Sequence, residues 1–164
     1  MPDEGAPPAG AAPLADARVA ALYQDAILEH FRRPRNRGAH ERPDARAEVR
    51  NPLCGDELEV TLLADGARVR EARAEARGCS IAAASASMMT ELVVGRTAAE
   101  VAALRGGLEA VLAGDPDAAA DAALGDLRAF AGLARFPARH RCALLPWEAL
   151  RRAMEALPGS RVGA

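Results

Sequence analysis

Residues 57–77 constrain the fold more than any other part of the chain, because two alternating stretches flank a short turn. The first stretch carries apolar residues at every second position, the period of a β-strand with one buried face: Leu58, Val60 and Leu62. The triplet Ala64-Asp65-Gly66 is a hairpin turn signal. After it, arginine and glutamate alternate, while small alanines fall out of step with Val69. We therefore expect an antiparallel hairpin whose second strand has a solvated, charged face.

Most of the remaining chain has the apolar period of amphipathic helices. We expect helices over residues 16–33, 80–95, 121–133 and 145–157, a further helix beginning at Thr97, and a short strand around Arg46–Arg50. Asp16 and Thr97 are expected N-cap residues, and Glu100 completes a capping box with Thr97. Pro146 fits the first turn of the last helix. The apolar residues are mostly Ala, Leu and Val, which favours closely packed helices over an aromatic-rich β-sandwich.

Length and charge exclude several classes of protein. The 164 residues suit one domain, which we place at residues 16–157 between a disordered N-terminal tail, 1–15, and a flexible C-terminal tail, 158–164. A net charge of −2 gives no basic footprint for nucleic acid. No apolar run is long enough to span a membrane, and no basic, apolar leader is present, so we expect a cytoplasmic protein. All 21 basic residues are arginine, which excludes a lysine Schiff base or a phosphate-loop lysine.

Three cysteines and one aspartate form the candidate site. Cys54 lies in a loop before a strand, Cys79 at the start of a helix, and Cys142 just before another helix. Asp56 follows Cys54 by two positions, and Gly55 between them permits a sharp turn. Three thiolates and one carboxylate suit tetrahedral zinc. The spacing alone is equally compatible with three unrelated buried cysteines.

The histidines offer weaker candidates. His140 precedes Cys142 by two residues and is either a substitute ligand or an exposed side chain. We interpret His30 as a partly buried packing residue and His40 as solvated. No glycine-rich phosphate loop or nucleophile elbow accompanies any of them. A carboxylate ligand makes a thiolate site more exchangeable than four thiolates would. A cysteine bound to the metal is deprotonated, so a cysteine that dissociates from it would be a nucleophilic thiolate.

The chain resembles the IscU/NifU-like family of iron–sulfur cluster assembly and, within it, the SufU type. The similar stretches run from about Leu22 to Leu150: "LYQDAILEHFRRPRNRG", "NPLCGD", "GCSIAAASASMMTELVVG" and "FPARHRCALLPWEAL". Between Cys79 and Cys142 lie 62 residues, 80 to 141, which matches the insertion of SufU proteins rather than the shorter IscU segment. "RFPAR" replaces the "LPPVK" stretch of IscU scaffolds, and Arg141 stands where SufU relatives commonly have lysine.

The resemblance implies an α+β fold, with a small antiparallel sheet packed against several helices and a zinc site at one end. It implies Cys54, Asp56, Cys79 and Cys142 as the zinc ligands. It further implies a sulfurtransferase in which Cys54 accepts persulfide sulfur from a SufS-type cysteine desulfurase. The sulfur would pass to a SufB-containing scaffold complex. Asp56 would hold the zinc during the exchange, and Arg139 would help to dock the desulfurase or position the acceptor.

Two other functions remain open at this stage. The same three thiolates suit an IscU-like scaffold on which a [2Fe–2S] cluster is assembled. A structural zinc module without transfer activity is the third reading, although a purely structural site would gain affinity from a fourth thiolate. Neither nucleic acid nor a membrane is an expected partner.

Overall fold

The computed structural model describes residues 24–157 of the 164. The predicted tails, the Asp16 cap and the start of the first helix lie outside these residues. The first helix is described over residues 24–32 and ends before Pro34, as its sequence predicts.

A three-stranded antiparallel sheet forms one side of the molecule. Its strands are β1 (Ala45–Arg50), β2 (Glu57–Asp65) and β3 (Arg68–Arg77), in the order β1-β2-β3. The β2–β3 hairpin and the short strand β1 are therefore confirmed. The loop between β1 and β2, residues 51–56, contains Cys54 and Asp56.

A β-bulge explains the irregular alternation of β3. Leu63 pairs with Glu71 but Ala64 pairs with Val69, which leaves Arg70 as an extra residue on β3. The insertion changes the parity of the strand. Val69 and Ala72, although three positions apart, are consequently both buried.

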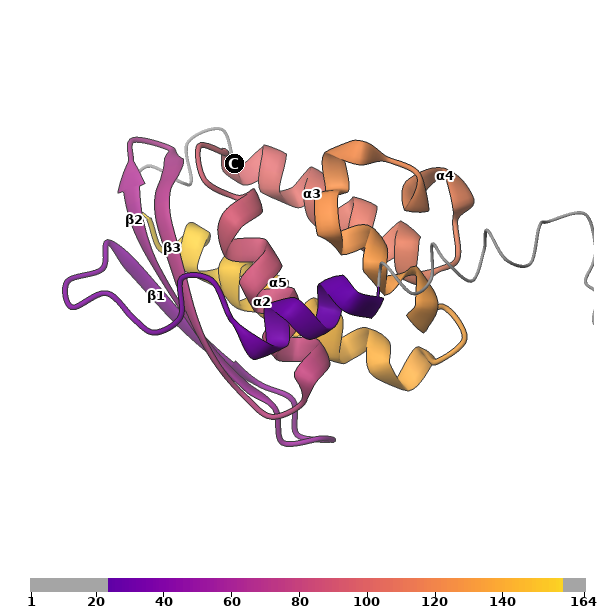
Figure 1. The fold of residues 1–164 in the computed structure, drawn as a ribbon. Coiled ribbons are helices and arrows are strands. Elements are labelled where there is room, and N and C mark those ends of the chain that lie inside the picture. Colours follow the sequence, from indigo (N-terminus) through magenta and orange to yellow (C-terminus); the bar gives the residue numbers. More distant parts are fainter. Residues whose placement is uncertain (1–23, 158–164) are drawn as a thin grey trace, which may run out of the picture.

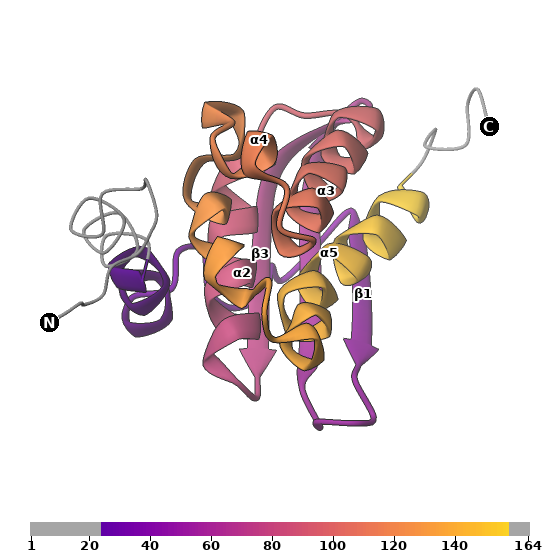
Figure 2. The same ribbon diagram turned by 90° about the vertical axis from the view of Figure 1, so that its right-hand side faces the viewer.

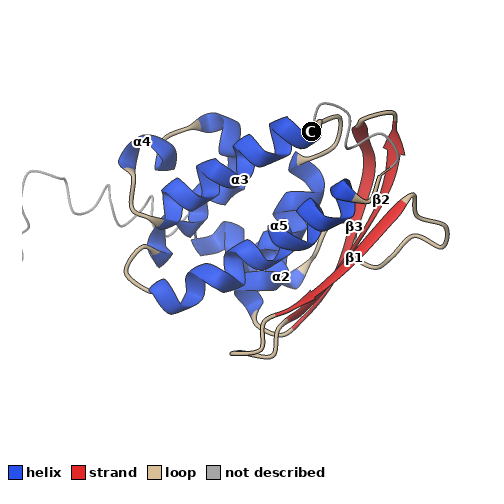
Figure 3. Cartoon of the chain, turned by 180° about the vertical axis from the view of Figure 1, so that it is seen from behind, coloured by secondary structure: helices blue, strands red, loops and turns tan. Residues whose placement is uncertain are grey.

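Helices cover one face of the sheet (Figures 1 and 3). α2 (Ser80–Leu92) packs on β3, and α5 (His140–Glu155) packs on β1 and β2. An outer layer contains α3 (Ala98–Leu112), the short α4 (Pro116–Ala119) and the 3-10 segment η1 (Ala122–Leu133), as Figure 2 shows. A 3-10 turn, η2 (Pro137–Arg139), leads into α5. These elements confirm the α+β class. Within residues 24–157, no helix combines the length and apolarity needed to cross a membrane.

The inner face of the sheet explains how two helices fit against it. The central strand presents Leu58, Val60 and Leu62, all at most 1% exposed. Their cross-strand partners are mainly alanines, which leave room for the helix backbones. α2 matches them with small buried residues of its own: Ala82, Ala84 and Ala86.

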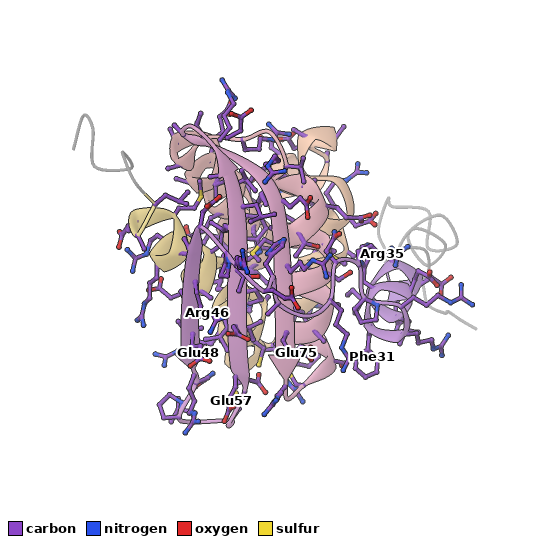
Figure 4. The ribbon with its side chains drawn as sticks, turned by 90° about the vertical axis from the view of Figure 1, so that its left-hand side faces the viewer. Phe31, Arg35, Arg46, Glu48, Glu57 and Glu75 are labelled. Carbon is purple, nitrogen blue, oxygen red and sulfur yellow. The ribbon has the colours of Figure 1, made fainter. Side chains whose placement is uncertain are left out.

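The outer face of the sheet is charged, and no helix of residues 24–157 covers it (Figure 4). Its ion pairs are Arg46–Glu59 at 3.3 Å, Arg50–Glu57 at 2.9 Å and Arg37–Glu75 at 3.3 Å. The predicted solvated face of β3 is thus confirmed. The expectation for His40 is wrong, because its ring contacts the Thr61 hydroxyl at 2.8 Å and its side chain is 7% exposed.

The helices differ from the sequence predictions in residues 122–133 and at the start of α5, and α2 ends at Leu92 rather than at Gly95. α3 has the expected capping box of Thr97 and Glu100 and runs through both central glycines. A Cβ on Gly107 would lie 2.5 Å from Leu124 Cδ2, so this glycine lets η1 pack closely. Residues 122–133 form a 3-10 segment rather than a regular helix, with a kink at Gly125. α5 begins at His140, so Pro146 lies inside the helix and not in its first turn.

Candidate metal centre

A tight loop presents Cys54 and turns Asp56 inward. The side-chain oxygen of Asn51 accepts from the Leu53 amide at 3.0 Å, and its carbonyl accepts from the Gly55 amide at 2.7 Å. Gly55 has φ +76°, a conformation that favours glycine. The two chemistry-bearing residues consequently face different environments, because Cys54 is exposed while Asp56 is 1% exposed.

Cys79 meets the Asp56 carboxylate at the start of α2. It is the N-cap residue, and its sulfur accepts from the Ala82 amide at 3.5 Å. Its own amide donates to Asp56 Oδ1 at 2.9 Å, and its thiol donates to Oδ2 at 3.2 Å. These two bonds join the β1–β2 loop to the helix.

Gly78 permits this contact. Its φ is +135°, and a Cβ built there would lie 2.7 Å from Asp56 Cγ and 2.9 Å from Asp56 Cα. Both distances are shorter than real contacts allow, and the second involves backbone. A side chain at this position is therefore incompatible with the observed place of Asp56.

Cys142 completes the group from the first turn of α5. Cys142 is 3% exposed, and its thiol neighbours Cys79 and Asp56. The ligand atoms of Cys54, Asp56 and Cys142 all lie within 4.8 Å of one another. Three separate parts of the chain thus meet at the Cys54 end of the sheet, where Cys54, Asp56 and Cys142 form one group and Cys79 adjoins it through its bonds to Asp56. We call Cys54, Asp56, Cys79 and Cys142 the thiol–carboxylate cluster.

Burial and hydrogen bonding shift two pKa values in opposite directions. For Asp56, burial alone would raise the pKa, but hydrogen bonds from the Cys79 amide and from the three thiols together hold it below its ordinary value. Burial raises the pKa of the Cys142 thiol, and the neighbouring Cys79 and Asp56 raise it further. Without a cation, the cluster therefore stabilises a carboxylate but keeps Cys142 as a thiol.

The cluster fits a divalent cation with a preference for sulfur. Asp56 is a buried carboxylate, and among the described residues no arginine or histidine pairs with it. A buried charge is normally paired or bound to a metal. Three sulfur atoms and one carboxylate provide the ligand number and type that tetrahedral zinc uses.

Arg139 and His140 lie near the cluster in sequence but do not join it. Arg139 is exposed at the end of η2, and the structure gives its guanidinium no hydrogen bond within the described residues. His140 donates from Nε2 to the carbonyl of Leu133 at 2.8 Å, which is a structural bond and not a ligand position. His30 is buried and bonds Ser87 and Asp126, in line with its predicted packing role.

Sequence reasoning missed two residues that shape the centre. Asn51 forms the turn that projects Cys54 by accepting a hydrogen bond from the Leu53 amide. Gly78 precedes Cys79, but the close approach of Asp56 is a tertiary contact with no local pattern.

Comparisons with known proteins agree with this architecture. A model of the NifU-like N-terminal domain matches residues 22–157. The chain is 36% identical to the zinc-dependent sulfurtransferase SufU of Bacillus subtilis strain 168, over 84% of this chain and 92% of that protein. It is 33% identical to the iron–sulfur cluster assembly scaffold protein IscU of Streptococcus pyogenes serotype M1, over 82% and 83%.

Solved structures show the same fold. A NifU-like N-terminal protein from Brucella abortus has a TM-score of 0.74 at 27% identity, covering 85% of this chain and 96% of that one. An iron–sulfur cluster assembly scaffold protein of the SUF system from Fervidobacterium islandicum AW-1 has a TM-score of 0.71 at 28% identity, covering 82% of this chain and 97% of that one. The chain therefore belongs to the family of NifU-like N-terminal domains.

Proposed function

We propose that this protein is a zinc-dependent sulfurtransferase of iron–sulfur cluster assembly, with Cys54 as the sulfur carrier. The observation that carries the proposal is the uneven exposure of the three thiols. Cys54 is exposed at a loop tip, Cys79 is half-buried and Cys142 is buried. A partner protein can therefore reach Cys54 while the other two stay in place. The sequence similarity to a protein named as a zinc-dependent sulfurtransferase supports the same conclusion.

The transfer step needs no outside oxidant or reductant. The Cys54 thiolate attacks the outer sulfur of a persulfide on the donor cysteine. A new S–S bond forms at Cys54 Sγ, the donor's S–S bond breaks, and the donor cysteine leaves as a thiolate. Cys54 then carries the persulfide, and an acceptor thiolate removes the outer sulfur by the same exchange.

The remaining residues of the cluster keep the site assembled during this exchange. Bound zinc supplies positive charge that keeps the cysteine sulfurs deprotonated. Asp56 holds Cys79 through the backbone amide of Cys79, at 2.9 Å, so this part of the cluster does not depend on Cys54. We place Cys54, Asp56, Cys79 and Cys142 as the zinc ligands. Arg139, exposed and three residues before Cys142, is proposed to help dock the donor protein.

The proposed partners follow from the chemistry of the two half-reactions. A PLP-dependent cysteine desulfurase of the SufS type would supply the persulfide in the cytoplasm, and a SufB-containing assembly complex would receive the sulfur. The test is to incubate the zinc-loaded protein with desulfurase and cysteine and to locate the added sulfur by peptide mass spectrometry. We expect it on Cys54, with Cys54→Ser as the control. Sulfur found mainly on Cys142 would contradict the assignment.

A [2Fe–2S] scaffold is the second candidate, because the similarity extends to a protein named as an IscU scaffold. Anaerobic reconstitution with iron and sulfide separates the two functions. A stable, stoichiometric visible chromophore on the zinc-free protein would favour the scaffold. Rapid loss of the chromophore on gel filtration would favour the carrier.

A further inference from the structure

Ser85 is a fully buried hydroxyl that joins the two helices carrying Cys79 and Cys142. Its Oγ donates to the carbonyl oxygen of Ala143 at 2.6 Å and accepts from Trp147 Nε1 at 3.2 Å. The side chain is 0% exposed. The hydroxyl donates its single proton to a carbonyl of α5. Removing the hydroxyl would break this direct link between the helices.

The turn of α5 that carries Cys142 lacks two of the hydrogen bonds that usually fix the start of a helix. Its N-cap residue, Arg139, makes no side-chain capping bond. Pro146 has no amide hydrogen, so it cannot donate to the carbonyl of Cys142 four residues earlier, as another residue in a helix would. The ladder of α5 is therefore interrupted at the residue whose sulfur belongs to the cluster.

The bond from Ser85 compensates for this interruption at the neighbouring residue. Ala143 directly follows Cys142, and Ser85 lies on α2, whose N-cap residue is Cys79. Fixing the Ala143 carbonyl against α2 fixes the start of α5 relative to Cys79. We propose that Ser85 is a positioning residue of the thiol–carboxylate cluster, which sets the distance of Cys142 from Cys79 for metal binding. The inference rests on the proposed metal-binding function of the cluster.

Ser87 provides a matched control on the same helix. It is also buried, at 2% exposure, and its hydroxyl accepts from the Arg35 amide at 2.8 Å and bonds His30 Nδ1 at 2.7 Å. Ser87 therefore connects α2 to the first helix and the turn after it. Ser87→Ala removes a comparable buried hydroxyl without touching the Ala143 carbonyl.

The experiment compares the zinc affinity of Ser85→Ala and Ser87→Ala with that of the unaltered chain, by competition with a chromophoric chelator. Circular dichroism sets a temperature at which all three proteins are folded. We expect Ser85→Ala to weaken zinc binding about tenfold, which is the smaller of the losses in metal affinity seen when residues that orient ligands are replaced. We expect Ser87→Ala to leave zinc binding nearly unchanged. Equal effects of the two substitutions, or no effect of Ser85→Ala, would overturn the inference.

A metal-free measurement separates this inference from the proposed function. In a Cys54→Ala background, a trivalent arsenical captures Cys79 and Cys142 together only when their sulfurs are close. We expect Ser85→Ala to slow this capture and Ser87→Ala to leave its rate unchanged. Failure of the unaltered chain to bind zinc would refute the proposed function. Unchanged capture in Ser85→Ala would refute the positioning role whatever the zinc result.

Discussion

Gly78→Ala tests whether the approach of Asp56 to α2 holds the cluster together. The new Cβ would lie 2.7 Å from Asp56 Cγ and 2.9 Å from its Cα, so rotation of the carboxylate cannot relieve the clash. The carboxylate must move away, and its bonds to the amide and thiol of Cys79, at 2.9 Å and 3.2 Å, would break.

The magnitude follows from two contributions. Holding alanine at φ +135° costs about 1–3 kcal/mol of backbone strain. Losing hydrogen bonds to a buried carboxylate costs about 1.5–3 kcal/mol. We therefore expect the free energy of unfolding of the zinc-free protein to fall by about 3–5 kcal/mol, a large part of the stability of an ordinary domain. Purified Gly78→Ala should also contain little zinc.

Gly66→Ala is the matched control for backbone strain. Gly66 also has a positive φ, +62°, but a Cβ there has nothing within 4 Å. We expect it to cost about 1 kcal/mol and to leave the zinc content unchanged. Urea denaturation and metal analysis of both variants make the comparison. A Gly78→Ala protein with full zinc and no more destabilisation than Gly66→Ala would refute the reasoning.

Two further predictions concern ionisation. Hydrogen bonds from Arg151 lower the pKa of Glu148 to about 2, although burial opposes this shift. Arg152 and Arg105 lower it further. Since the ordinary value is 4.5, these ion pairs stabilise the protein above that pH and lose their effect as pH falls toward 2. Glu148→Gln should therefore cost about 1 kcal/mol at neutral pH and progressively less below pH 4.5 in urea denaturation, and a pH-independent cost would contradict this. In the zinc-free protein at mildly alkaline pH, iodoacetamide should modify exposed Cys54 quickly and buried Cys142 much more slowly, because burial raises the pKa of Cys142. Peptide mass spectrometry would detect the contrary order.

The sheet was largely predictable because its signals are local. Alternation over Leu58–Leu62 and the turn at Gly66 identify the hairpin, and Thr97 with Glu100 marks a helix start. The alanines that fall out of step with Val69 are the trace of the bulge, but alternation alone does not identify Arg70 as the extra residue, because its place is set by the pairing with β2. The predicted start of α5 was wrong, because a proline is typical of the first turn of a helix, whereas Pro146 lies inside α5.

The grouping of the four site residues came from the family resemblance more than from spacing. Cys54 and Asp56 are neighbours in sequence, but Cys79 and Cys142 reach them only through the packing of α2 and α5. The contributions of Gly78 and Ser85 are contacts between distant segments, which no local pattern reports.

The most direct test of the central claim is the rate of alanine release by a SufS-type cysteine desulfurase, measured without an added strong thiol. We expect the zinc-loaded protein to stimulate this rate strongly and Cys54→Ala to abolish the stimulation while remaining folded. Stimulation that persists undiminished in Cys54→Ala would contradict the role of Cys54. Absence of any stimulation by the unaltered protein would contradict the sulfurtransferase itself.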